Sequence, residues 1–348
     1  MICLLLATLL LALLGTLVLQ RYALSRKIMD TPNARSSHTV PTPRGGGVAI
    51  VLVFIAALAV WARFGEPASR MLWALLPGGA LVATVGFWDD HISLSARTRF
   101  TCHCLAAVWA VACLGGWPVL ELGFTSWAWG WLGIGAAALG LAWAINLYNF
   151  MDGIDGLAGA QAVFIGGAGG VLLWLSGGDG VPCWLLAASA AGFLLLNWPP
   201  ARIFMGDAGS GFLGYAIGVL ALHATTIGKT TIWPWAILLS VFFVDATLTL
   251  CRRAWFGLRV TDAHRTHAYQ WASRRVGSHR TVTLAVLAIN LLLLLPAALF
   301  AQAWPVWSVP LTIFCWVILF GVAWFLGAGL PEEAGAQGRG PSGEIPGA

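Results

Sequence analysis

The stretch "LGIGAAALGLAWAINLYNFMDGIDGLAG", residues 132–159, decides the fold class of this chain. An apolar run ends at residue 145, and polar side chains follow at once: Asn146, Asn149, Asp152 and Asp155. Carboxylates are costly near lipid, so acids at the end of such a run indicate a functional site with compensating partners. If the segment is helical, three of these side chains form a stripe at spacing i, i+3, i+6. The alternative is a glycine-rich junction whose acids favour the next helix N-terminus.

The composition of the whole chain agrees with a membrane protein. Of its 348 residues, 59% are hydrophobic and 9% are charged. A soluble domain carries about 25% charged residues, so this chain has too few to cover a water-exposed surface. Apolar runs of about 20 residues, long enough to cross a hydrocarbon core of about 30 Å, recur along it. A membrane β-barrel would show short alternating strands instead. We therefore predict an all-α polytopic membrane protein with no nucleic-acid partner.

About eleven transmembrane helices are predicted, and the loops between them fix an orientation. The segments are 2–20, 46–64, 71–87, 101–117, 127–145, 159–176, 182–197, 209–225, 231–250, 282–301 and 304–329. Of the 19 Lys and Arg residues, only Arg63, Arg70 and Lys229 fall in loops after even-numbered segments. The positive-inside rule then predicts a periplasmic N-terminus and a cytoplasmic C-terminus. We expect one domain over 1–330 and a disordered, Gly- and Pro-rich cytoplasmic tail over 331–348.

Two further acidic motifs lie on the predicted cytoplasmic side. "FWDDHISLSARTRF" (87–100) places Asp89 and Asp90 together at a helix end. The alternative here is helix-end solvation with Arg97 and Arg99 as local counter-charges. "NWPPARIFMGDAGSGFLGY" (197–215) places Asp207 after Gly206, where glycines before a helix N-terminus suit a bound phosphate. A small-residue packing face explains this second motif equally well.

The basic motifs lie on the same side. The loop 251–280 is the longest and contains "HRTH" at 264–267. "SSHTVPTPRGGGVAI" (36–50) adds His38 and Arg44 in a turn-rich segment. The alternative for the long loop is contact with anionic lipid through its arginines. Cys102-His103-Cys104 resembles a metal-binding tract but has no second ligand pair, and we interpret it as packing inside a span.

Together the motifs predict a site for a phosphate-containing substrate. Arginine, histidine and glycine turns favour phosphate, whereas a carboxylate about 4 Å from a phosphate charge repels it by roughly 4 kcal/mol at an effective dielectric of 20. A divalent cation between the two removes the conflict. Mg²⁺ is usually held by one or two acids plus substrate phosphates. The sequence thus favours phosphoryl transfer at a membrane surface.

The ordered motifs also carry a family resemblance. "DTPNARSSHTVPTPRGGG", "FWDDHISLSARTRF", "NLYNFMDGIDGLAG", "IFMGDAGSGFLG" and "HRTHAYQ" follow one another over residues 20–280. In this order they resemble the polyprenyl-phosphate N-acetylhexosamine-1-phosphate transferases. The resemblance implies transfer of a sugar-1-phosphate from a UDP-N-acetylhexosamine to undecaprenyl phosphate, which releases UMP. It also implies Mg²⁺ as cofactor, with Mn²⁺ as a substitute, and a site facing the cytoplasm at the bacterial inner membrane.

The resemblance also assigns roles to residues of this chain. Asp207 would be the principal magnesium ligand with Asn149 beside it, and Asp89 the general base. The other implied catalytic and substrate-binding residues are Asp90 by the lipid phosphate, Asp152 and Asp155 in the nucleotide pocket, and Asn146, Gly206, His264, Arg265, His267, His38 and Arg44 around the substrates. A homodimer is also expected.

One departure narrows the expected donor. The lipid I-forming relatives carry a histidine-rich triplet where this chain has His-Arg-Thr-His at 264–267. We therefore expect an enzyme of the O-antigen-initiating branch instead of one that uses UDP-MurNAc-pentapeptide. Two other classes of protein remain as alternatives: a secondary transporter that uses Asp245 within the ninth segment, and a lipid-binding scaffold supported by the basic loops.

Overall fold

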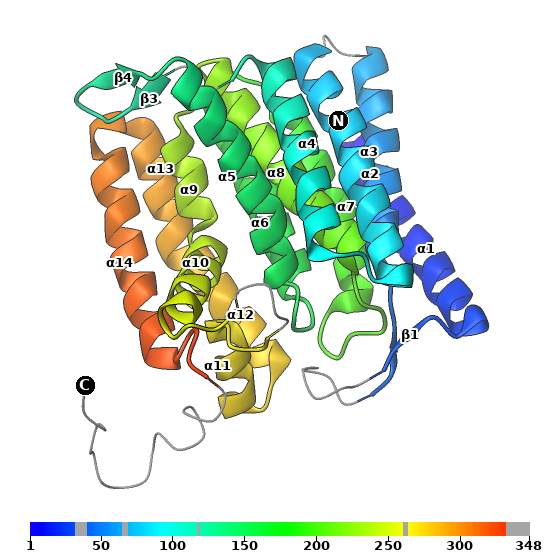
Figure 1. Cartoon of the computed structure of the whole chain (residues 1–348). Coiled ribbons are helices and arrows are strands. Elements are labelled where there is room, and N and C mark those ends of the chain that lie inside the picture. The colour runs from blue at the N-terminus through cyan, green and yellow to red at the C-terminus, as the bar shows by residue number, and fades with distance from the viewer. Residues whose placement is uncertain (32–39, 65–68, 117–118, 260–263, 332–348) are drawn as a thin grey trace, which may run out of the picture.

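The computed structural model describes residues 1–31, 40–64, 69–116, 119–259 and 264–331. Within these ranges the chain forms a bundle of roughly aligned helices (Figure 1). His38 and the predicted disordered tail from residue 332 onward lie outside the described residues.

The helices follow one another through most of the chain. They are α1 (Ile2–Arg26), α2 (Gly47–Phe64), α3 (Ser69–Ile92), α4 (Ala96–Leu114), α5 (Trp131–Phe150), α6 (Leu157–Leu175), α7 (Val181–Asn197), α8 (Asp207–Thr226), α9 (Ile232–Leu238), α10 (Ser240–Trp255), α11 (Ala268–Val276), α12 (His279–Ile289), α13 (Leu295–Ala303) and α14 (Ser308–Leu326). A π-helical turn, Asn290–Leu294, joins α12 to α13. Two antiparallel hairpins pair β1 (Met29–Asp30) with β2 (Thr42–Pro43) and β3 (Val119–Glu121) with β4 (Ser126–Ala128).

All eleven predicted segments overlap a helix or a helix pair. In the described part of the chain, eight helices are long and apolar enough to cross a membrane, among them α12 joined to α13. The pair α9 and α10 forms one more such segment, bent by 75°, and α7 is a shorter apolar helix. The remaining segment, α4, begins with the polar turn Ala96–Arg99, which lowers its hydropathy. The prediction of an all-α polytopic membrane protein is confirmed, and the number and direction of the crossings stay predictions.

Helix α8 lies at the centre of the bundle, and its first residue is Asp207 of the 197–215 motif. Of its span, 89% is buried, compared with 17% for α1 at the edge. A Cβ on Gly86 of α3 would lie 2.4 Å from the carbonyl oxygen of Asp207. Only glycine therefore permits α3 to approach the first residue of α8 this closely. This contact brings the "DD" motif at the end of α3 next to Asp207.

A polar network holds the bend between α9 and α10. The Gln161 side chain donates to the carbonyl oxygen of Leu238, at the break, over 3.1 Å. Asn290, at the start of the π-helical turn, donates to the Gln161 side-chain oxygen over 2.6 Å. A backbone carbonyl released by a helix break inside a membrane needs such a donor. Beyond the bend, Asp245 of α10 lies beside the first turn of α11.

Candidate active site

A cavity of about 850 Å³ unites four of the sequence motifs. Its walls come from α3, α4, α5, α8 and α10, with the 264–270 segment closing one side. It lies toward the end of the bundle that also holds α11, the lower end in Figure 1. Five predicted site residues line it: Asn146, Asn149, Asp207, His264 and His267. The predicted convergence of the acidic and the histidine motifs is therefore present in the fold.

Asp207 belongs to a cluster of three acids and two arginines. Its carboxylate accepts from Arg44 over 2.7 Å and lies 3.5 Å from Arg99. Arg44 also contacts Asp90 at 2.8 Å, and Arg99 contacts Asp89. The acids outweigh the effect of burial on Arg44, so its pKa is raised and it stays charged. The cluster joins the 36–50, 87–100 and 197–215 motifs around one carboxylate.

Asp89 and Asp90 lie behind the cavity instead of lining it. Asp90 accepts from the backbone N–H of Asp207 over 3.0 Å and of Ala208 over 3.4 Å, so it caps α8 from a neighbouring helix. Asp89 accepts from the backbone N–H of Leu94 over 2.6 Å as well as from Arg99. Gly206 provides room for this arrangement, because a Cβ there would lie 2.6 Å from an oxygen of Asp90.

The predicted stripe of Asn149, Asp152 and Asp155 is interrupted by the end of a helix. Helix α5 ends at Phe150, so only Asn149 lies on it. Asn149 donates to the hydroxyl of Ser210 on α8 over 3.1 Å, which leaves its side-chain oxygen available as a ligand atom. Asp152 follows the helix end, where burial raises its pKa well above the usual range and the charges of Asp207 and Asp90 act in the same direction.

Asp155 points to a different set of partners. Its carboxylate accepts from the backbone N–H of Ala201 over 3.0 Å and lies 3.3 Å from the ring of His279. Its carbonyl oxygen accepts from Thr283 over 3.0 Å. The structure therefore places Asp155 at the junction of the 198–206 loop with α12, and it is absent from the cavity lining.

The "HRTH" segment is held in place by Asp245. This buried carboxylate of α10 accepts from the backbone N–H of Ala268 over 2.8 Å and of Tyr269 over 3.0 Å, at the first turn of α11. It also lies 3.3 Å from Nδ1 of His267. Sequence reasoning missed this role because the partners are 22 or more positions apart. Asp245, the residue on which the transporter alternative was based, therefore caps the N-terminus of α11.

His264 and His267 form a stacked pair in the cavity wall. Their ring centroids are 5.0 Å apart, and Thr266 lies 3.2 Å from Nδ1 of His264. Burial, together with the charges of the neighbouring His267 and Arg253, lowers the pKa of His264 to about 3. His264 is therefore uncharged at neutral pH and offers hydrogen bonds instead of a fixed positive charge. Arg265 does not line the cavity.

Among the cavity-wall residues that were not predicted as site residues, Arg99, Tyr269 and His103 have polar side chains. Arg99, which the sequence showed only as a counter-charge, lines the cavity and contacts two of the acids. Tyr269 lines it as well and donates to the carbonyl oxygen of Phe150 over 2.9 Å. His103, interpreted above as packing, is the third. His103 follows Arg99 by four residues, which places both side chains on one face of a helix. This spacing could have identified His103 from the sequence.

The donor atoms present fit a magnesium ion that shares its coordination with a substrate. Among the described residues, no three His, Cys, Asp or Glu side chains form a group that could hold a metal by themselves. Mg²⁺ commonly takes only one or two protein ligands and completes its shell with phosphate oxygens and water. Asp207 and Asn149 meet that requirement because they line the same cavity. Arg44 and Arg99 now hold the Asp207 carboxylate, and a dication would take over that role.

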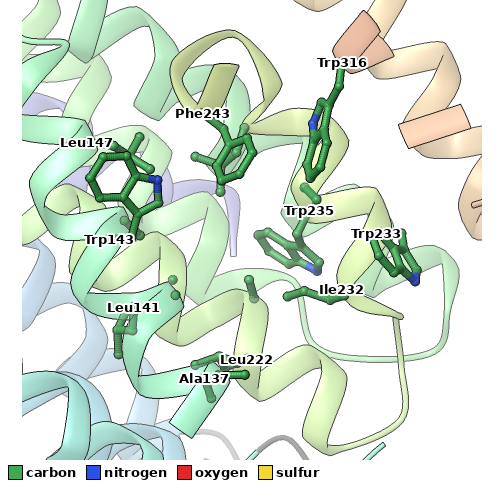
Figure 2. Close-up of a pocket in the computed structure, with 17 residues that line it drawn as sticks. Ala137, Leu141, Trp143, Leu147, Leu222, Ile232, Trp233, Trp235, Phe243 and Trp316 are labelled. Carbon is green, nitrogen blue, oxygen red and sulfur yellow. The ribbon is translucent and has the colours of Figure 1, made fainter. Parts of the chain in front are cut away.

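An apolar groove lies next to the polar cavity. It encloses about 350 Å³ and is lined by residues of α5, α8, α9, α10 and α14. Figure 2 shows Trp143, Trp235, Phe243 and Trp316 around it. Trp143 lines both the groove and the cavity. The two spaces therefore share this side chain as a wall.

Comparison with known proteins agrees with the motifs. The profile of glycosyl transferase family 4 matches residues 72–225. A probable undecaprenyl-phosphate N-acetylglucosaminyl 1-phosphate transferase of Bacillus subtilis is 29% identical, over 90% of this chain and 88% of its own length. A decaprenyl-phosphate N-acetylglucosaminephosphotransferase of Mycobacterium tuberculosis is 30% identical, over 73% and 71%.

A third relative is named for an N-acetylmuramoyl-pentapeptide substrate. The phospho-N-acetylmuramoyl-pentapeptide-transferase of Moorella thermoacetica is 35% identical, over 53% of this chain and 62% of its own length. The family profile, the order of the motifs and these relatives agree with one another. The chain belongs to glycosyl transferase family 4, within the polyprenyl-phosphate hexosamine-1-phosphate transferase superfamily.

Proposed function

We propose that the protein transfers a sugar-1-phosphate from a UDP-N-acetylhexosamine to undecaprenyl phosphate. The products are undecaprenyl-diphospho-sugar and UMP. The observation that carries the proposal is that Trp143 lines both the polar cavity and the apolar groove, so that the two spaces lie next to each other. A reaction between a nucleotide sugar and a lipid phosphate needs one space for each substrate, with the reacting groups at their junction. The names of the relatives support the same reaction.

The reaction is an in-line displacement at the β-phosphorus of the nucleotide sugar. An oxygen of the lipid phosphate forms the new bond to phosphorus, and the bond to the bridging oxygen breaks, so that UMP departs with that oxygen. In this proposal Asp89 is the general base: it lies behind Arg99, and it reaches the proton of the lipid phosphate once Arg99 turns from Asp89 to the substrate. Arg44 and Arg99, once they no longer hold Asp207, contact phosphate oxygens. His264 and His267 hold the diphosphate by hydrogen bonds.

Magnesium would be held by Asp207 and Asn149. When bound, Mg²⁺ neutralises charge on the diphosphate, and Mn²⁺ can take its place. In this proposal Asp152 lines the nucleotide side of the site. Asp155 acts from its position beside His279 by fixing the 198–206 loop.

The proposed setting is a bacterial inner membrane that the chain crosses eleven times. The N-terminus is then periplasmic, and the cavity opens to the cytoplasm, where UDP-sugars are available. Residues 1–330 act as one domain. The loop charges support this orientation, since 16 of the 19 Lys and Arg residues fall in the loops after odd-numbered segments or in the C-terminal tail.

The donor proposed first is UDP-GlcNAc, at the initiation of O-antigen or another cell-envelope polysaccharide. Two of the relatives are named for N-acetylglucosamine. Arg265 and Thr266 lie between the two histidines of "HRTH". This chain therefore lacks the histidine-rich triplet expected for enzymes that use UDP-MurNAc-pentapeptide.

The proposal is tested by incubating the purified protein with undecaprenyl phosphate, Mg²⁺ and single UDP-sugars. The panel contains UDP-GlcNAc, UDP-GalNAc, UDP-MurNAc-pentapeptide and UDP-glucose, and the Asp207→Asn variant serves as the control. We expect mass spectrometry to detect a lipid-linked diphospho-GlcNAc and an equal amount of UMP. Formation of no lipid-linked product from any donor would contradict the proposed reaction. Release of UMP without the lipid acceptor would contradict the role of the groove.

A further inference from the structure

The chain folds back against the "HRTH" segment directly after its last helix. Helix α14 ends at Leu326, at the end of the bundle where α11 also lies (Figure 1). Gly327, in the left-handed conformation, terminates it, and residues 327–330 form a turn, called here the C-terminal turn. The backbone N–H of Gly329 donates to the carbonyl oxygen of Thr266 over 2.8 Å. A segment far along the chain therefore contacts the backbone between the two histidines of "HRTH".

The C-terminal turn is packed into the protein and does not lie on its surface. Ala328 is 0% exposed and joins Leu248 of α10 and Ala268 of α11 in a small apolar cluster. The carbonyl oxygen of Ala328 accepts from the Arg252 guanidinium over 3.2 Å. That guanidinium also lies 4.0 Å from the centre of the Trp324 ring. The turn is therefore fixed to both α10 and α14.

Position 329 of the turn requires a glycine. Its φ of +75° is a backbone conformation that other residues rarely adopt. A Cβ at Gly329 would also lie 2.7 Å from the carbonyl oxygen of Thr249 and 2.8 Å from Cβ of Arg252, both on α10. The absence of a side chain lets the turn approach α10 closely enough for its N–H to reach Thr266.

The peptide group between Thr266 and His267 is held at both of its ends. Its carbonyl oxygen accepts from Gly329, and its N–H donates to the side-chain oxygen of Gln270 over 3.2 Å. Because a peptide group is planar, fixing its oxygen and its nitrogen fixes the whole plane. The plane in turn sets the direction in which the next side chain leaves the backbone. That side chain is His267, in the cavity wall.

We infer that Gly329 is a positioning residue for the transferase: through the C-terminal turn it holds His267, and with it the stacked His264, at the diphosphate of the nucleotide sugar. This assignment rests on the proposed function, in which both histidines bind that diphosphate. Gly329 does not line the cavity, so it acts through the peptide group that follows Thr266. Asp245 holds the same segment from α10, at the first two N–H groups of α11. The "HRTH" segment is therefore held from two sides.

Hydrogen exchange tests whether the turn holds the segment, and it needs no substrate. In purified Gly329→Ala, we expect the peptide 264–276 to exchange about 10-fold faster than in the wild type, because the new Cβ moves the turn away from Thr266. The matched control is Gly228→Ala. Gly228 follows α8 and also has a positive φ, +66°, but a Cβ there would meet open space.

The control adds backbone strain without a clash near the segment. Gly228→Ala should therefore exchange over 264–276 as the wild type does. Equal exchange over this peptide in the two variants, whether fast or slow, would overturn the inference.

Kinetics test whether the held segment serves the nucleotide sugar. In the transferase assay, Gly329→Ala should lower kcat/KM for the nucleotide sugar about 10- to 100-fold, as expected when a binding group is displaced by about 1 Å. KM for undecaprenyl phosphate should stay unchanged. A rise in both KM values by the same factor would show a general structural effect and overturn the assignment.

A double-mutant cycle tests the route through His267. His267→Asn removes the imidazole but keeps a side chain that caps α11 at its N-terminus. If Gly329 acts by placing this imidazole, the loss of kcat/KM in the double variant should be smaller than the product of the two single losses. Single losses that multiply fully would overturn the route.

A second variant covers the case in which Gly329→Ala does not fold. Arg252→Leu removes the guanidinium that binds the Ala328 carbonyl oxygen and keeps an apolar side chain beside Trp324. It should show the same faster exchange of 264–276 and the same selective kinetic loss, and wild-type exchange in this variant would overturn the inference. If the wild type transfers no sugar, the proposed function fails, while hydrogen exchange still decides whether the C-terminal turn holds the "HRTH" segment.

Discussion

Replacing Asp245 by asparagine should loosen the first turn of α11 without unfolding the bundle. The carboxylate accepts from two buried backbone N–H groups, those of Ala268 and Tyr269, at 2.8 and 3.0 Å. Hydrogen bonds to a charged group contribute about 1.5–3 kcal/mol each. Asparagine keeps one acceptor oxygen but turns an amide N–H₂ toward the second N–H group. We therefore expect a loss of about 2–3 kcal/mol in the local stability of α11.

Hydrogen exchange of the peptide 264–276, followed by mass spectrometry, measures this loss. A loss of 2–3 kcal/mol corresponds to exchange that is about 30- to 150-fold faster, if α11 opens locally. Because His264 and His267 are carried by this segment, kcat/KM of the transferase should fall by at least about 10-fold. Asp245→Ala, which removes both acceptors, should have a larger effect.

Thr249→Val provides the control for Asp245. The Thr249 hydroxyl donates to the same carboxylate over 3.1 Å, from α10 itself instead of from α11. Its loss should cost about 1 kcal/mol and leave exchange of 264–276 nearly unchanged. If Asp245→Asn exchanged and reacted like the wild type, the carboxylate would not be what holds the "HRTH" segment.

Four further outcomes test the rest of the site. Asp207→Asn should lower UMP release by more than about 100-fold while the protein still folds, and wild-type turnover would exclude the proposed metal role. Exhaustive chelation should abolish transfer, and addition of Mg²⁺ or Mn²⁺ should restore it; activity that persists after chelation would contradict a metal-dependent reaction. Gly86→Ala should lower both thermal stability and activity, because the new Cβ would lie 2.4 Å from the Asp207 carbonyl oxygen, whereas Gly135→Ala, with open space around it, should do neither. With the pKa of His264 lowered to about 3 by burial, the unfolded chain binds a proton that the folded chain does not. The free energy of unfolding of the wild type should then fall as the pH drops from about 6.5 towards 3. His264→Asn has no imidazole and lacks this loss, so the difference in thermal unfolding midpoint between the two proteins should narrow over that range.

The sequence predicted the fold class and the convergence of the motifs for the same physical reason. Long apolar runs must cross the bilayer as helices, and alternating crossings bring every second loop to one face. Asn149, Asp207 and His267 come from loops or helix ends on that face, and the structure places all three in one cavity. This part of the prediction needed no knowledge of side-chain packing.

The parts that failed depend on contacts between distant residues. The helical stripe assumed that α5 continued past Phe150, but the chain turns there and Asp155 binds the 198–206 loop instead. The role of Asp245 depends on the bend between α9 and α10, for which the local sequence gives no proline-based reason. His103, interpreted as packing, is buried as expected, but its place in the cavity wall depends on neighbouring helices and could not be seen from its own sequence.

The pairing of Arg44 and Arg99 with Asp207 has a consequence for how the protein matures. Two of the three negative charges are balanced by arginines of the same chain, so insertion and folding do not have to wait for an ion from the cytosol. The proposed metal would have to compete with two guanidinium groups, and by itself it would have little to gain. The ion and the sugar nucleotide should therefore strengthen each other's binding, since a diphosphate offers both arginines a new anionic partner at the moment they release the old one.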